Sequence, residues 1–264
     1  MERLASNTRE ASQRTLTHLK NTIQDTSLRE LISYYTVEGS VGHLLDAERD
    51  SLRVHSFQVF EMEHIMNMGA RALVPVLLYL FHRLEQRFDG SPTLLILDEA
   101  WVLIQHPLFR EKIQEWLRVL RKSNVAVVFA SQSLNDVIKS PIADVIFEST
   151  STKIFLPNPE ASSPEFSALY QNIGLNERQI QIIANATPKR HYYLVNTDGK
   201  RLFDLGLGRI ALAFVGSSPK KDRPFVDDLV AKYGKEWVPF WLANKGVSSD
   251  WIRFWRERAL MEEK

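Results

Sequence analysis

The spacing of apolar residues predicts a chain that begins as helix and then alternates between strands and helices. Its first section carries one strand-like alternation among helical patterns. The predicted elements are a helical stretch from Glu2 to about Tyr35, a loop or short hairpin over 36–51, a strand over Val54–Glu61, and a helix over Ile65–Phe88 that bends near Pro75.

A β-α-β rhythm follows a turn at Asp89–Pro92. The predicted elements are strands over Leu94–Leu97, Val125–Ala130 and Lys153–Leu156, a helix over Pro107–Lys122, and one or two short helices between Leu134 and Phe147 that break at Pro141. Strands that are apolar on both faces and alternate with helices indicate a parallel sheet covered on both sides.

The last section of the chain predicts a helical region, a hairpin and a tryptophan-rich tail. The predicted elements are helix over Glu165–Ala186 with a break near Gly174, a hairpin of Tyr192–Asn196 and Leu202–Leu207 around Asp198-Gly199, a basic linker over Ser217–Arg223, and three short helices from Pro224 to Lys264. The pairs Trp237/Trp241 and Trp251/Trp255 each share one helical face. These faces either pack onto the core or form a docking surface.

Composition narrows the chemistry available to the chain. The 264 residues include no cysteine, which excludes a disulfide scaffold, a thiolate metal site and a cysteine nucleophile. A formal net charge of +1 gives no overall case for nucleic-acid binding. The start of the sequence is polar, and the longest apolar run, Ala72–Phe81, is much shorter than the roughly 20 residues of a bilayer span. We therefore expect a soluble chain.

Two adjacent carboxylates, Asp98 and Glu99, end the aliphatic run Leu94–Leu97. A P-loop nucleotide hydrolase needs this arrangement, because the strand fixes an aspartate that holds Mg²⁺ through its water shell. The glutamate then lies one residue further on, where it can polarise the attacking water. The alternative is that the pair only ends a strand and caps the next helix.

Three other side chains fit the same chemistry. Gln132 follows the next strand, at the sheet edge where α/β proteins bind ligands, and can contact the lytic water and the γ-phosphate. Alternatively, it caps the helix that begins near Leu134. Arg118 and Arg121 lie on the helix between the strands, and one of them can supply a cation to a neighbouring subunit's site. The alternative for each arginine is a solvated helix face.

Taken in order, five blocks resemble the conjugal-transfer ATPase family of type IV secretion systems, the TrbE, CagE and VirB-four kind. The blocks are LLILDEAW, WLRVLRKSN, VVFASQSLND, TKIFLPNPEA and GLNERQIQIIANATPKRHYYL. The resemblance runs from about Ser56 to Leu207, and within it Asp98 and Glu99 match the Walker B pair. Gln132 matches the glutamine after the next strand, and Arg118 and Arg121 match the basic helix, with Arg121 favoured as the trans-acting cation.

The resemblance implies an α/β fold, an incomplete RecA-like P-loop NTPase core with a mostly parallel sheet, a C-terminal β-hairpin and a helical tail. It implies three segments: an N-terminal helical segment (1–53), the Walker B half of the core (54–216) and the tail (217–264). It also implies ATP and Mg²⁺ as cofactors, and a hexameric motor at the cytoplasmic face of the inner membrane. The motor's partners would be other secretion components and a DNA or protein substrate.

The sequence departs from that family in one respect. No G-x-x-x-x-G-K-[ST] occurs, so the backbone cradle and the lysine that hold phosphates are missing from these residues. We therefore expect no ATP hydrolysis from this chain alone, and we expect one side of the parallel sheet to be uncovered. Two alternatives stay open: a non-catalytic RecA-like assembly protein, or a fragment of a DNA-translocating coupling ATPase.

Overall fold

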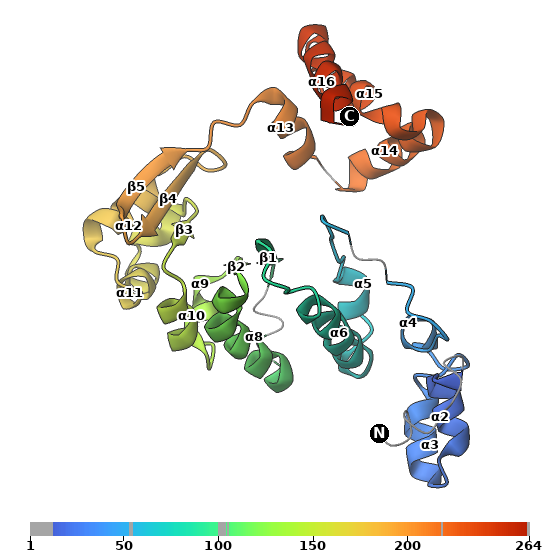
Figure 1. The fold of residues 1–264 in the computed structure, drawn as a ribbon. Helices are drawn as coiled ribbons and strands as arrows, with labels where there is room; N and C mark the ends of the chain where they lie inside the picture. The colour runs from blue at the N-terminus through green and yellow to red at the C-terminus, as the bar shows by residue number, and fades with distance from the viewer. Residues whose placement is uncertain (1–12, 53–54, 100–103, 105, 218, 263–264) are drawn as a thin grey trace. The chain divides into compact units, whose positions relative to one another are not determined.

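The computed structural model describes residues 13–52, 55–99, 104, 106–217 and 219–262. These residues form two compact units, Met1–Ile146 and Phe147–Lys264 (Figure 1). Helices predominate, and the strands form a two-stranded sheet of order β1-β2 and a three-stranded sheet of order β3-β4-β5. The expected mostly parallel sheet is therefore wrong for the described residues, because only β1 and β2 run parallel. The α/β class itself is confirmed.

The first unit holds most of the predicted β-α-β rhythm. Its helices and strands are α2 (Leu16–Thr22), α3 (Thr26–Ser33), α4 (Gly42–Leu45), α5 (Glu63–Met66), α6 (Ala70–Glu85), β1 (Thr93–Leu97), α8 (Pro107–Val119), η2 (Leu120–Ser123), β2 (Val125–Phe129), α9 (Leu134–Ile138) and α10 (Ala143–Ser149), which crosses the unit boundary. The strands β1 and β2, the helix between them and the two short helices around Pro141 are confirmed.

Three predictions in this unit need correction. The strand predicted over Val54–Glu61 is wrong, since residues 55–61 are irregular and Phe57 is 84% exposed. Alternation makes a strand only where a neighbouring strand can pair with it, and 55–61 pair with none in the described chain. The N-terminal helix is interrupted where Asp25 caps α3, and the long helix breaks at Gly69, whose φ is 81°.

The buried carboxylate of Asp46 fastens the first helices to the loop that follows them. It accepts hydrogen bonds from the backbone N–H groups of Leu16 (2.7 Å), Thr17 (3.1 Å) and Val37 (2.8 Å), and one from the Thr17 hydroxyl. Burial alone would raise its pKa, but these hydrogen bonds together lower the pKa below 3.8. The ionised carboxylate thus supplies the acceptor that the N-terminus of α2 needs.

Pro75 lies inside α6 and leaves one carbonyl of that helix without its usual donor. The carbonyl in question is that of Arg71, four residues earlier, and the Tyr35 hydroxyl donates to it at 3.0 Å. The Arg71 guanidinium lies over the Tyr34 ring at 4.1 Å from its centroid. Two adjacent tyrosines therefore attach the N-terminal segment to α6 at the position that the proline exposes.

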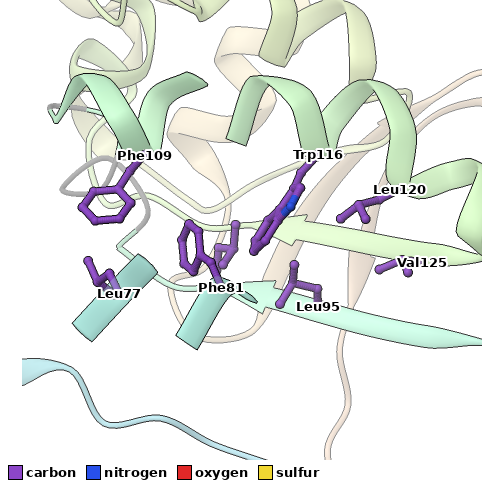
Figure 2. Packing of buried hydrophobic residues seen from close by; sticks show 8 residues of the cluster. Leu77, Phe81, Leu95, Phe109, Trp116, Leu120 and Val125 are labelled. Carbon is purple, nitrogen blue, oxygen red and sulfur yellow. The ribbon is translucent and has the colours of Figure 1, made fainter. Parts of the chain in front are cut away.

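The core of this unit lies between α6, α8 and one face of the β1–β2 pair. Figure 2 shows Phe109, Trp116 and Leu120 projecting toward the side chains of α6 and the strands. The buried members of this cluster are Leu77, Phe81, Leu95, Leu97, Phe109, Trp116, Leu120 and Val125. The indole N–H of Trp116 donates to Glu85 at 2.7 Å, and Lys112 pairs with the same carboxylate at 2.6 Å. The largest core side chain therefore has its polar atom satisfied.

The opposite face of the same strands is uncovered, as expected from the sequence. Leu94, Ile96 and Val128 are 62%, 59% and 45% exposed, whereas their neighbours Leu95 and Leu97 are buried. The register pairs Leu94 with Ala126 and Ile96 with Val128, so these four side chains form one continuous apolar surface. We call it the uncovered β1–β2 face.

The second unit contains the antiparallel sheet and the helical tail. Its elements are β3 (Lys153–Phe155), η3 (Pro159–Ser162), α11 (Pro164–Asn172), α12 (Glu177–Asn185), β4 (His191–Asn196), β5 (Gly199–Asp204), α13 (Arg209–Val215), α14 (Pro219–Tyr233), η4 (Gly234–Trp237), α15 (Val238–Asn244) and α16 (Ser249–Glu262). The hairpin around Asp198-Gly199 and the break near Gly174 are confirmed. The linker predicted over Ser217–Arg223 is wrong, because α14 begins at Pro219.

The tail has a core of its own, which separates the two interpretations of the tryptophan pairs. Trp241 is 2% exposed and, with Leu242 and Val247, belongs to a cluster that Trp237 and Trp255 also contact. Trp251 is 53% exposed and meets the ring of Phe254 edge-on. Core packing is therefore confirmed for three of the four tryptophans. The segment boundaries at 53/54 and 216/217 stay predictions.

We predict that removal of the Asp46 carboxylate loosens the N-terminal helices. Asp46→Ala leaves three backbone donors without their acceptor, at a cost of roughly 1–3 kcal/mol. Because the pKa of Asp46 is lowered by folding, this stabilisation is present above the unfolded value of 3.8 and is lost as pH falls through the folded pKa. Hydrogen exchange of the Leu16 and Val37 amides measures both effects. Asp25→Ala, at an exposed cap, serves as the control with a smaller effect confined to α3.

We also predict opposite outcomes for two tryptophans of the tail. Trp241→Ala empties a fully packed position and lowers the free energy of unfolding by roughly 3–5 kcal/mol. Trp251→Ala changes it by at most about 0.5 kcal/mol, because that side chain is half exposed. Urea denaturation followed by far-UV circular dichroism measures both variants. Equal losses in the two variants would contradict the packing described here.

Candidate functional site

The carboxylate pair lies at the carboxyl end of β1, where the chain leaves the sheet. Asp98 directly follows the last strand residue and is exposed, and its Oδ1 accepts the backbone N–H of Glu99 at 3.1 Å. This short bond folds the Asp98 side chain back on the turn. Residues 100–103 lie outside the described ranges, so the alternative that the pair caps the next helix concerns residues on which the structure gives no information.

Glu99 has a left-handed backbone, with φ of 51°. A residue with a Cβ pays roughly 1–2 kcal/mol for this conformation, and such strain concentrates at functional sites. The half-buried Glu99 side chain leaves the strand in a direction that extended backbone does not give. Nothing in the sequence signals this strain, because glutamate is not typical of left-handed positions.

Gln132 lies at the same edge of the sheet as Asp98. The two strands are paired in register up to Leu97 and Phe129, and the N–H of Ala130 donates to the Leu97 carbonyl at 3.0 Å. Gln132 follows a few residues later and is exposed. Neighbouring strands are about 4.8 Å apart, so both chain segments emerge beside each other.

The alternative that Gln132 caps the following helix is wrong. Ser133 is the N-cap of α9, and its hydroxyl accepts the N–H of Asp136 at 3.2 Å. The serine and the aspartate three residues later were the available sequence signal for this cap. Gln132 therefore has no capping role and remains exposed at the carboxyl edge of the sheet.

Arg118 and Arg121 lie toward the other end of the strands. Helix α8 leads from the carboxyl end of β1 back to the amino end of β2, and both exposed arginines stand near its C-terminal end. Arg121 lines an open groove together with Thr93, Leu94 and Asn124, all at the amino ends of the strands. A strand of five residues spans roughly 16 Å. The structure thus brings Asp98, Glu99 and Gln132 to one edge and places the arginines toward the other.

The donor atoms at the carboxyl edge fit a portion of a magnesium site. Carboxylate oxygens are the ligands that Mg²⁺ prefers, and it keeps several waters when few protein ligands are present. Among the residues that the structure describes, no group of three or more His, Asp or Glu side chains is placed to hold a metal ion directly. Asp98 can therefore hold the ion through water, and the remaining ligands would have to come from nucleotide phosphates.

The groups that define a P-loop ATPase class are thus a parallel strand ending in two carboxylates and a neighbouring strand followed by glutamine. Residues 10–198, well over half of the chain, match the family model described as the TraG P-loop domain. The chain belongs to the TrbE and VirB4 family of conjugal-transfer and type IV secretion ATPases, and it corresponds to a later portion of those proteins.

Relatives in two groups support this assignment. A probable conjugal transfer protein TrbE of Sinorhizobium fredii is 51% identical over 233 residues, which cover 88% of this chain and 35% of the relative. The conjugal transfer protein TrbE of Rhizobium radiobacter is 50% identical over 239 residues, covering 90% and 29%. The type IV secretion system protein virB4 of Bartonella henselae is 27% identical, covering 75% and 26%. The chain thus spans about a third of its relatives' length.

A solved structure supports the fold. The structure of VirB4 of Thermoanaerobacter pseudethanolicus superposes with a TM-score of 0.53, at 18% identity, over 69% of this chain and 50% of that chain. Within the ranges of the chain that the structure describes, no helix is both long and apolar enough to cross a bilayer.

We predict that glycine suits position 99 better than alanine. Both substitutions remove the Glu99 side chain, but only glycine adopts the left-handed backbone without strain, so Glu99→Gly should be more stable than Glu99→Ala by roughly 1 kcal/mol. Urea denaturation of both variants measures the difference. The same pair of changes at Ser131, whose φ is not positive, should show no advantage for glycine. An alanine variant as stable as the glycine variant would contradict the left-handed geometry.

Proposed function

We propose that this chain carries the metal-holding and water-activating half of the ATP site in a motor of type IV secretion and conjugal transfer. The observation that supports it most is the placement of Asp98, Glu99 and Gln132 at one edge of two parallel strands. The strained backbone of Glu99 adds to this support, since a residue that only ends a strand has no need of it.

Each side chain has a role that follows from its chemistry. Asp98 holds Mg²⁺ through a water molecule. Glu99 accepts a proton from the attacking water, and its longer side chain reaches further than that of the aspartate. Gln132 donates and accepts hydrogen bonds, which suits contact with both the water and a γ-phosphate oxygen. The nucleotide supplies the phosphoryl group, and the ion neutralises charge that develops on it.

Arg121, or alternatively Arg118, provides the cation that completes the site of a neighbouring subunit. Both arginines are exposed and lie toward the sheet edge opposite Asp98, so neither is placed to serve its own chain's carboxylates. An arginine that acts in trans needs such a position on the subunit surface. A ring of subunits, with six as the expected number, satisfies this geometry.

The phosphate-binding loop must come from polypeptide beyond these 264 residues, because no G-x-x-x-x-G-K-[ST] occurs within them. The relatives are about three times as long as the matched segment, so they contain room for it. The complete protein would act at the cytoplasmic face of the inner membrane with other secretion components. It would help to assemble the channel and pilus and to move a DNA or protein substrate.

A non-catalytic scaffold is the second candidate function. The missing loop favours it, whereas Asp98, Glu99 and Gln132 have no evident role in a scaffold. A DNA-translocating coupling ATPase would need a DNA-binding extension, and the described tail is a small helical cluster built around Trp241. We therefore favour the ATP-site half.

We predict no measurable ATP turnover from the chain alone. Its rate should equal that of the Asp98→Ala, Glu99→Ala double variant, because neither protein can cradle the phosphates. Mixing the chain with the portion of the Rhizobium radiobacter relative that precedes the matched segment should produce turnover. In that mixture, Glu99→Gln should lower the rate roughly 100-fold or more. Phosphate release measures all four samples.

Two results would contradict the proposal. The first is robust turnover by the chain alone that the double variant abolishes. The second is a stable mixture that hydrolyses ATP equally well with Glu99 and with glutamine at that position. The matched control is Glu165→Gln in the first turn of α11, which should leave the rate unchanged.

A further inference from the structure

The uncovered β1–β2 face is the largest departure of this molecule from the physics of its own strands. Leu94, Ile96 and Val128 are aliphatic and more than two-fifths exposed. Parallel strands are normally covered on both faces, because their connecting helices lie there. Here α6 and α8 both contact the same face, through Leu95, Leu97 and Val125.

The edges of the sheet are open as well as its face. Within the described residues, β1 pairs only with β2, so each strand has one side whose N–H and C=O groups meet no further strand. A two-stranded sheet is marginal by itself and gains stability from further strands or a covering helix. The molecule thus offers a partner two features together: a strand edge and an apolar surface.

A phosphate loop comes with two elements that match these features. It is a strand, a glycine-rich loop and a helix in direct succession. A strand can occupy the open edge, and an amphipathic helix can cover Leu94, Ile96 and Val128. The loop between them would then lie at the carboxyl edge, beside Asp98 and Gln132, where the proposed site needs phosphate contacts.

The groove at the amino end of the strands continues the same surface. It is lined by Leu94, Ala126 and Asn124 among others, and the first two are a register pair of the uncovered face. A helix that starts at the carboxyl edge and runs back along the strands would end at this groove. The surface is therefore about as long as the strands and is hollowed at the end where such a helix would finish.

We infer that the uncovered β1–β2 face is the docking surface for the strand and helix that flank the phosphate loop. This inference rests on the proposed function, since it names the partner of the same site. The occupant is a polypeptide segment with an apolar helix face and a parallel strand. The share of the relatives that lies outside the matched segment, 65% or more, is where we place it.

The test measures association, independently of hydrolysis. The probe is the portion of the Rhizobium radiobacter relative that precedes the matched segment, titrated with the 264-residue chain in a calorimeter. Ile96→Ser should weaken binding roughly 10-fold, and Leu94→Ser with Ile96→Ser roughly 100-fold, because each change removes an aliphatic side chain from the contact. Val215→Ser, at an exposed position on α13, is the matched control and should bind like the unaltered chain.

Folding of the variants can be checked directly. Both altered side chains are exposed, so far-UV circular dichroism and the thermal midpoint should match those of the unaltered chain. Hydrogen exchange adds a second readout, because the amides of β1 and β2 should become protected on addition of the probe. Protection should be lost again in the double variant.

The outcomes separate this inference from the proposed function. Binding that is weakened by Ile96→Ser, in a mixture without ATP turnover, supports the docking surface and contradicts the ATP-site proposal. Turnover in a mixture whose binding ignores both substitutions overturns the docking surface and leaves the ATP-site proposal standing. Absence of binding by the unaltered chain, or self-association of the chain that Ile96→Ser abolishes, also overturns the inference.

Discussion

The parallel pairing of β1 with β2 is the interaction on which the rest of the first unit depends. It aligns the strands from Thr93 and Val125 to Leu97 and Phe129, so both chains turn away from the sheet at the same level. The core on one face holds this pair in place through Trp116, whose indole N–H is satisfied by Glu85. Without that register, the polar residues that follow each strand would not share an edge.

The same pairing divides the molecule's chemistry by direction. Residues that follow the strands carry carboxylate and amide oxygens, and residues that precede β2 carry guanidinium groups. A subunit of this kind has an acidic edge and a basic edge separated by roughly the length of a strand. Repetition of such subunits around a ring would place the basic edge of one copy toward the acidic edge of the next.

Local elements were predictable from the sequence where apolar continuity and turn residues agree. The strands β1 and β2, the hairpin at Asp198-Gly199 and the helix break near Gly174 follow from short-range rules. The parallel arrangement of β3 was not, because pairing partners are chosen by tertiary contacts, and β3 pairs antiparallel with β4. The alternation over Val54–Glu61 misled for the same reason, since nothing in the described chain pairs with 55–61. At the candidate site, the four aliphatic residues before Asp98 identify the end of a strand. The left-handed backbone of Glu99 and the capping role of Ser133 depend on the path of the turns, which no periodicity encodes.

Pro75 has a consequence for how the segments of this unit are joined. A proline in a helix is usually counted as a loss, but here it converts an internal acceptor, the Arg71 carbonyl, into an external one that Tyr35 uses. A better helix former at that position would strengthen α6 and compete with the tyrosine for the same oxygen. Helix regularity and tertiary attachment are therefore exchanged against each other at a single atom, and in this chain attachment prevails.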